Sequence, residues 1–270
     1  MPKILNEAEK RKTFAKYFDC PMVPPPQEIY DLLSKGPIDP SGALHIKDRN
    51  NLLAPGYLDC ERGFCIMPDG TGFIAMLTEM PGVTMEMIEW WFVWHGLEDL
   101  RYAIWCHDDH LGIHVRPEDL ERRLDKSLSL KERNWNTTDV VYEDIGNGPM
   151  LLDISFMSPE DFGFDMDQFK EPNTLGAISA NLSISETKTP MVTFTHFVRA
   201  IEGGVECRSR FWLGWQIINK EPIIVNNEIP LELIEGLANH CPKEYANLAA
   251  ILPSVYAENV HIEDEIENFR

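Results

Sequence analysis

Five strand-like segments in the second half of the chain constrain the fold most strongly. They are "TDVVYEDI" (138–145), "MLLDISF" (150–156), "TLGAISANLSIS" (174–185), "MVTFTHFVRAIE" (191–202) and "VECRSRFWLGWQI" (205–217). The last two meet across Gly203 and Gly204, a pair that is typical of a hairpin turn. Two segments with helical spacing follow, "PLELIEGLANHC" (230–241) and "KEYANLAAILPSVYAE" (243–258). This order predicts an α+β domain, with C-terminal helices packed on an antiparallel sheet.

The first half of the chain adds a hairpin and a helix to this sheet. In "FCIMPDGTGFIAMLTE" (64–79) a Pro-Asp-Gly turn separates two apolar runs, which predicts a hairpin. "PGVTMEMIEWWFVWHG" (81–96) is typical of a helix that Thr84 caps and Gly96 ends. Residues 1–60 are rich in proline and contain one short helical candidate, 27–34. We therefore expect an N-terminal arm over residues 1–60 and a main domain over residues 61–270.

Charge excludes several classes of partner. The chain has 24 basic and 44 acidic residues, and a net charge of −20 disfavours both nucleic acid and anionic membrane surfaces. No apolar run reaches the roughly 20 residues of a membrane span, and the first residues lack the features of a signal peptide. The six cysteines form no CxxC pair, so free thiols in the cytoplasm are expected.

One predicted strand carries a carboxylate among aliphatic side chains. With a period of two, Asp139, Val141, Glu143, Ile145 and Asn147 share one face of the strand over 139–147. If that face is inward, the carboxylate of Glu143 must be protonated, paired with a cation or bound to a metal. If it is outward, Glu143 is simply solvated, and the pattern alone does not choose.

Several histidines are candidates for the same chemistry. The stretch "LRYAIWCHDDHLGIH" holds His107, His110 and His114, and we expect a strand running into a turn there, so that at most two of them share a site. His240 occupies the predicted break between the two C-terminal helices, and His95 follows the tryptophan-rich helix. His196 lies on the apolar side of its strand, where a histidine is more often a core residue than a catalyst. His110, Glu143 and His240 would suit Zn²⁺ with an open position, or Fe²⁺, but their spacing does not select them.

Several of these segments together resemble one family. "LRYAIWCHDDH", "VVYEDIG", "FTHFVR" and "LANHCPKEYANLAAILPSVYAE" are similar to segments of the 2,4-diacetylphloroglucinol hydrolase and phloretin hydrolase family. The resemblance implies a Bet v 1-like helix-grip domain, an N-terminal dimerisation portion and a homodimer. It also implies a Zn²⁺-dependent hydrolase that cleaves the carbon–carbon bond between a polyhydroxylated aryl ring and its acyl group in an aromatic ketone.

The resemblance also implies roles for individual residues. His110, Glu143 and His240 fall on zinc-ligand positions, and Tyr102 and His196 fall on polar positions of the pocket. We expect His196 to transfer a proton and Tyr102 to hold a ring hydroxyl or the developing oxyanion, with Glu143 counted among the catalytic residues.

The chain departs from the family pattern at two places. A second glutamate is expected about four residues from Glu143, where this chain has Asp139 and Asn147. We therefore expect Asn147, Asp139 or a water as the fourth metal ligand. A pocket tyrosine is replaced by Phe211, which affects the choice of acyl substrate more than the reaction class.

Two other functions fit the same features. Helix-grip domains often carry hydrophobic ligands without chemistry, and an Fe(II) oxygenase would use the same three ligands. Bound metal separates the hydrolase from the carrier, and oxygen dependence separates it from the oxygenase.

Overall fold

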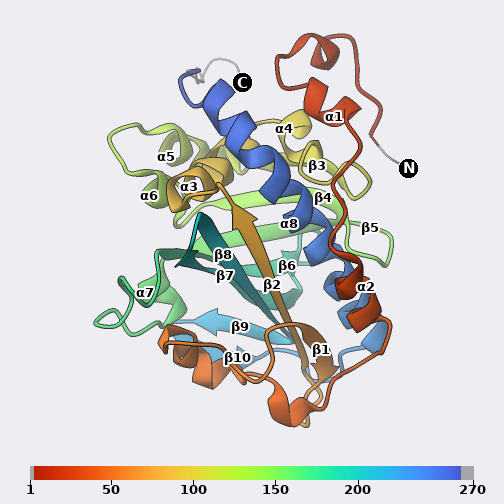
Figure 1. Cartoon of the computed structure of the whole chain (residues 1–270), viewed down its shortest axis with the longest axis vertical. Helices are drawn as coiled ribbons and strands as arrows, with labels where there is room; N and C mark the ends of the chain where they lie inside the picture. The colour runs from red at the N-terminus through yellow and green to blue at the C-terminus, as the bar shows by residue number, and fades with distance from the viewer. Residues whose placement is uncertain (1–2, 263–270) are drawn as a thin grey trace.

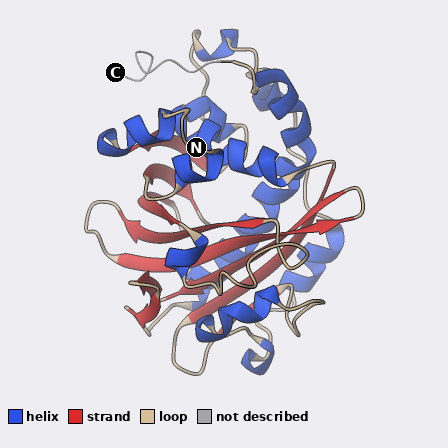
Figure 2. Ribbon diagram, turned by 90° about the vertical axis from the view of Figure 1, so that its left-hand side faces the viewer, coloured by secondary structure: helices blue, strands red, loops and turns tan. Residues whose placement is uncertain are grey.

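An eight-stranded antiparallel sheet organises the chain. The computed structural model describes residues 3–262, and its strands follow the order β1-β2-β8-β7-β6-β5-β4-β3 (Figure 1). A separate pair of strands, β9 and β10, lies beside it. The twist of the strands is visible in the side view of Figure 2. The expected α+β class is confirmed. The assignment to a helix-grip fold stays a prediction.

Most strands match the segments that the sequence predicted, but the predicted segment 205–217 is divided between β8 and β9, and β10 was not predicted. The strands are β1 (Gly63–Ile66), β2 (Gly72–Pro81), β3 (His110–Val115), β4 (Thr138–Asp144), β5 (Pro149–Met157), β6 (Gly176–Ile184), β7 (Pro190–Ile201), β8 (Gly204–Leu213), β9 (Trp215–Ile218) and β10 (Glu221–Ile224). Phe64 pairs with Ile74, and Ile201 pairs with Gly204, so both predicted hairpins are confirmed.

Helices and 3-10 turns connect and cover the strands. The helices are α1 (Lys16–Asp19), α2 (Gln27–Leu33), α3 (Met85–Trp94), α4 (Asp99–Ala103), α5 (Leu120–Leu124), α6 (Leu130–Asn134), α7 (Pro159–Phe162) and α8 (Leu231–Asn259). The 3-10 turns are η1 (Glu9–Arg11), η2 (Pro40–Gly42), η3 (Ile46–Leu53), η4 (His95–Leu97) and η5 (Pro117–Asp119). As predicted, the Thr84 hydroxyl caps α3 by accepting from the Met87 backbone N–H. None of the helices within residues 3–262 has the length and apolar character needed to cross a membrane.

The C-terminal region is one helix rather than two. α8 runs without interruption through Pro242 and Pro253 and crosses the sheet, where it packs mainly on β2 (Figure 1). The predicted break at His240 was therefore wrong. A proline inside a helix costs about 3 kcal/mol, but burial of residues such as Leu248 and Leu252 against the sheet outweighs that cost.

The histidine-rich stretch also differs from its prediction. We expected a strand that runs into a turn, whereas the structure has α4, then a turn over residues 104–109, then β3 beginning at His110. The aspartates therefore lie in the turn, and His110 is the first residue of an edge strand.

The N-terminal arm covers the sheet of its own chain. Phe14 and Ile29 belong to the core that also contains α8, whereas Leu44 and Leu52 pack on the opposite face of the sheet. Alternate residues of the strands therefore meet different partners, and both faces of the sheet are buried. The predicted dimerisation role of this arm stays a prediction, and residues 263–270 of the predicted main domain lie outside the described residues.

A buried ion pair holds the end of α3 to the sheet. Arg123 is fully buried and bonds to both Asp139 carboxylate oxygens, at 2.9 and 3.3 Å, and to the Phe92 carbonyl. Gly96 makes this possible, since a Cβ there would lie 2.6 Å from Arg123 Nη1 and 3.0 Å from Asp139 Oδ2.

We predict that Gly96→Ala destabilises the protein by about 1–3 kcal/mol, because the added methyl group displaces the Arg123 guanidinium from its buried partners. The matched control is Gly42→Ala, where an added Cβ meets nothing within 4 Å. Urea unfolding of both variants measures the effect. Equal unfolding free energies for the two variants would contradict the prediction.

Candidate metal centre and cavity

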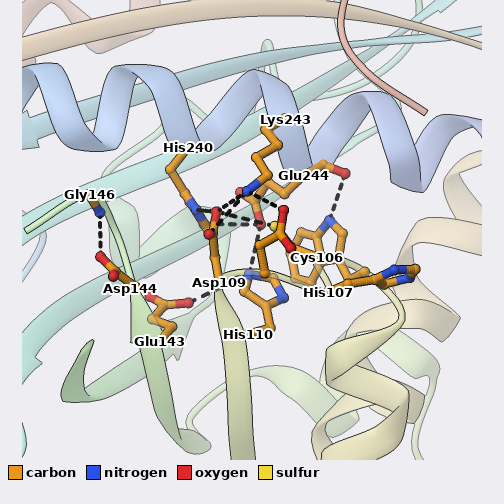
Figure 3. A network of polar contacts seen from close by, with 12 residues as sticks. Cys106, His107, Asp109, His110, Glu143, Asp144, Gly146, His240, Lys243 and Glu244 are labelled. Atoms are coloured by element: carbon orange, nitrogen blue, oxygen red, sulfur yellow. Dashed lines mark hydrogen bonds and ion pairs between the residues drawn. The ribbon is translucent and has the colours of Figure 1, made fainter. Parts of the chain in front are cut away.

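Three buried side chains from distant parts of the sequence meet at one point. Ligand atoms of His110, Glu143 and His240 all lie within 4.8 Å of one another, and each residue is buried. Figure 3 shows His240 pointing from α8 toward the strands that carry His110 and Glu143. The structure therefore brings together three of the residues predicted as metal ligands.

Pairing and close packing position these residues. Antiparallel pairing of β3 and β4 places His110 directly opposite Glu143. The turn after β4 lies so close to α8 that a Cβ on Gly146 would be only 2.6 Å from the Gly236 Cα. Gly236 precedes His240 by about one helical turn, so this close approach sets the height of His240 above the strands.

Hydrogen bonds at Nδ1 of both histidines leave Nε2 as the nitrogen that can bind a metal. His110 Nδ1 lies 3.2 Å from the Tyr102 carbonyl, and His240 Nδ1 lies 3.1 Å from Asp109 Oδ2. Since both partners accept hydrogen bonds, each Nδ1 carries a proton, and Nε2 is the nitrogen that faces the cluster. His110 Nε2 is buried without a hydrogen-bond partner.

Glu244 adds a fourth donor that the sequence did not predict. Its Oε2 lies 3.5 Å from His110 Nε2 and 3.7 Å from His240 Nε2. The residue follows His240 by four positions on α8, so both side chains lie on one face of the helix. A pattern of His followed four residues later by Glu is visible in the sequence, but the predicted helix break at His240 concealed it.

The electrostatics of the cluster favour a cation. Burial raises the pKa of Glu143, and it raises the pKa of Glu244 to about 8 against the opposing effect of His240. Burial alone would lower the pKa of His240, but Glu244 and Asp109 raise it to about 9. Two imidazoles and two carboxylates crowded in a buried space are the donor set of a divalent metal ion.

The other residues considered for the fourth position lie elsewhere. Asn147 is exposed on the turn after β4, and its amide donates to the Glu232 carbonyl at 3.4 Å. Asp139 is held by Arg123. The prediction of Asn147 as a ligand is therefore corrected by the geometry: β4 ends at Asp144, so the alternation of faces does not continue to residue 147.

A second group of potential ligands shares His240. Among residues 3–262, Cys106, Asp109 and His240 also come within 4.8 Å. Asp109 already accepts from His240, from Lys243 at 3.0 Å and from the Cys106 thiol at 3.3 Å, and burial raises the pKa of that thiol. We therefore interpret Cys106 and Asp109 as residues that orient the His240 side chain and not as a second metal site.

A largely apolar cavity opens beside the cluster. Its walls include the aromatic rings of Phe92, Phe156, Phe194 and Phe211, together with Leu182 and Leu237. The cluster residues Glu143, His240 and Glu244 line the same cavity. A flat apolar molecule held here would be in contact with a bound metal ion.

Tyr102 and His196 both line this cavity, as predicted for pocket residues. The Tyr102 ring stacks on His110 with centroids 3.9 Å apart, and its hydroxyl donates to Glu143. Burial raises the pKa of Tyr102 well above its ordinary value. His196 Nδ1 lies 2.8 Å from the Ser209 hydroxyl, and burial lowers the pKa of His196 to about 3. His196 is therefore neutral at physiological pH, whereas a histidine with its ordinary pKa would be partly protonated.

The two other histidines of the histidine-rich stretch, His107 and His114, do not line the cavity. His107 packs on Phe18 and points away from the cluster (Figure 3), and His114 is exposed. His110 is thus the histidine of this stretch that joins the site.

Comparison with known proteins agrees with this geometry. Residues 44–257 match the family model described as the DAPG hydrolase PhiG domain. The chain is 35% identical over 261 residues to the phloretin hydrolase of Eubacterium ramulus, covering 94% of this chain and 93% of that protein. It is 29% identical over 269 residues to the 2,4-diacetylphloroglucinol hydrolase of Pseudomonas protegens, covering 93% of this chain and 86% of that protein. The chain belongs to the DAPG hydrolase family.

Proposed function

We propose that this protein hydrolyses the carbon–carbon bond between a polyhydroxylated aryl ring and its acyl group, with zinc as its cofactor. The observation that carries the proposal is a buried cluster of His110, Glu143, His240 and Glu244 facing an aromatic-lined cavity. The names of the relatives, phloretin hydrolase and 2,4-diacetylphloroglucinol hydrolase, support this substrate class.

The donor set supports zinc among the divalent metals. Zn²⁺ binds histidine nitrogen and carboxylate oxygen, and in catalytic sites it polarises a carbonyl and lowers the pKa of water to about 7. Asp109 would hold His240, and the Tyr102 carbonyl would hold His110, in the orientation that presents Nε2.

In the proposed reaction, the oxygen of water adds to the acyl carbon and a proton is delivered to the ring carbon that leaves. The products are a deacylated ring and a carboxylic acid. The Tyr102 hydroxyl remains protonated because of its raised pKa, so it can exchange its hydrogen bond to Glu143 for one to an oxyanion on the acyl group. Neutral His196, with Ser209 on its other nitrogen, can relay a proton toward the ring.

A helix-grip fold and a homodimer are supported by the family resemblance, and residues of the arm already pack on their own chain. A cytoplasmic location fits the six free cysteines.

We predict that purified protein cleaves phloretin or diacetylphloroglucinol to the deacylated ring and free acid. A chelator should abolish the reaction because it removes the cation from the cluster, and the exclusion of oxygen should have no effect. Chromatography of both products measures the outcome. Dependence on oxygen would favour the Fe(II) oxygenase. A purified protein that neither binds metal nor cleaves either ketone would favour the carrier.

We predict that Glu244→Gln lowers zinc affinity by at least about tenfold, because a buried anionic donor becomes neutral. Asn147→Ala is the control and should keep the affinity of the unchanged protein. Competition with a chromogenic chelator measures both. Equal affinities for the two variants would exclude Glu244 from the centre.

We predict that His196→Ala retains its zinc and loses about 10²–10⁴-fold in kcat, since a proton relay is removed without a metal ligand being lost. Metal analysis and steady-state kinetics on the same preparation separate these effects. Full activity of the variant would remove His196 from the mechanism.

A further inference from the structure

A third histidine in the cavity is used neither by the metal cluster nor by the proposed proton transfer. His95 is the first residue of η4, directly after α3, and is only 2% exposed. Its ring stacks on Trp91 with centroids 5.6 Å apart and on Tyr102 at 5.8 Å, and it meets the edge of Trp105 at 5.3 Å. The ring is therefore fixed in one orientation, next to a residue that contacts Glu143.

One hydrogen bond determines which nitrogen of His95 carries its proton. Nδ1 lies 2.6 Å from the Trp91 carbonyl oxygen, and a carbonyl only accepts, so Nδ1 must donate. Burial and the nearby Arg123 charge lower the pKa of His95 to about 3, so the ring is neutral. In the neutral ring, Nε2 then carries a lone pair and no proton.

This lone pair has no partner among the described residues. His95 lines the cavity, and no group within residues 3–262 forms a hydrogen bond with Nε2. An acceptor atom on a cavity wall with no protein partner can take a hydrogen bond from water or from a ligand donor.

The other polar groups of the cavity are already engaged. The Tyr102 hydroxyl donates to Glu143, and His196 Nδ1 shares a hydrogen bond with the Ser209 hydroxyl, while the other nitrogen of His196 is assigned to the proposed proton transfer. Most of the remaining wall is apolar, including Phe211 at the position where the family resemblance implies a tyrosine. His95 Nε2 is thus a fixed hydrogen-bond acceptor beside the metal cluster, and a ring hydroxyl is a donor of matching chemistry.

We infer that His95 Nε2 accepts a hydrogen bond from a hydroxyl of the substrate's aryl ring and makes the enzyme select free phenols over their methyl ethers. The inference rests on the proposed function. It assigns the binding of the ring, as distinct from that of the acyl group, to a residue outside the metal cluster. An ether at the same position has no proton to donate and leaves Nε2 unpaired.

Two substitutions test the acceptor. His95→Phe keeps an aromatic ring for stacking and removes the lone pair, while the Trp91 carbonyl retains its bond from the backbone N–H of residue 95. His95→Gln can restore an acceptor oxygen near the position of Nε2. His114→Phe is the matched control, because His114 is exposed and outside the cavity.

The measurement is the ratio of kcat/KM for phloretin to that for its ring methyl ethers, with zinc-loaded proteins. We expect His95→Phe to lower this ratio at least tenfold, His95→Gln to recover part of it, and His114→Phe to leave it unchanged. A ratio unchanged in a folded, zinc-loaded His95→Phe protein overturns the inference.

A binding experiment distinguishes failure of this inference from failure of the proposed function. Calorimetric titration of the zinc-loaded proteins with phloroglucinol needs no turnover. Weaker binding by His95→Phe than by His114→Phe supports the acceptor role even if no ketone is cleaved. Equal binding, or no binding by the unchanged protein, overturns it. Nitrogen-15 spectra give a further readout: a proton found on Nε2 rather than Nδ1 would also overturn it.

Discussion

The contact between α8 and the turn after β4 is the constraint on which the site depends. At Gly146 and Gly236 the two backbones approach so closely that neither position has room for a side chain. This contact places His240 and Glu244, one helical turn apart, over the paired residues His110 and Glu143. Four donors from three separate segments therefore converge through backbone packing, with no flexible loop supplying a ligand.

Buried charge is the cost of this arrangement, and the surrounding residues offset part of it. Lys243 and His240 both bond to Asp109, which keeps the pKa of that carboxyl below its usual range although burial alone would raise it. The Glu143 carboxylate accepts a hydrogen bond from the Tyr102 hydroxyl. Within residues 3–262, the Glu244 carboxylate has no comparable donor apart from the two histidines of the cluster. A divalent cation would neutralise the two buried glutamates more completely than these neighbours do.

The strands could be predicted because successive side chains of a strand point to opposite faces of the sheet. In and directly after β4, for example, Val141, Glu143 and Ile145 are buried, while Tyr142 is exposed. Prediction from the sequence failed where a local rule conflicted with tertiary packing. A helix break was predicted between residues 241 and 243, but burial of α8 keeps the helix continuous, and the break hid the shared helix face of His240 and Glu244. The expected fourth ligand, Asn147, Asp139 or a water, was instead sought close to Glu143 in the sequence. The donor role of His95 Nδ1 could not be predicted at all, since it depends on the position of one carbonyl oxygen.

The most direct test of the metal centre is zinc-edge X-ray absorption on the loaded protein, because two overlapping ligand groups share His240. The cluster of His110, Glu143, His240 and Glu244 predicts only nitrogen and oxygen neighbours, at about 2.0–2.2 Å, with the scattering pattern of imidazole. A sulfur neighbour at about 2.3 Å would place the ion at Cys106 and contradict the account.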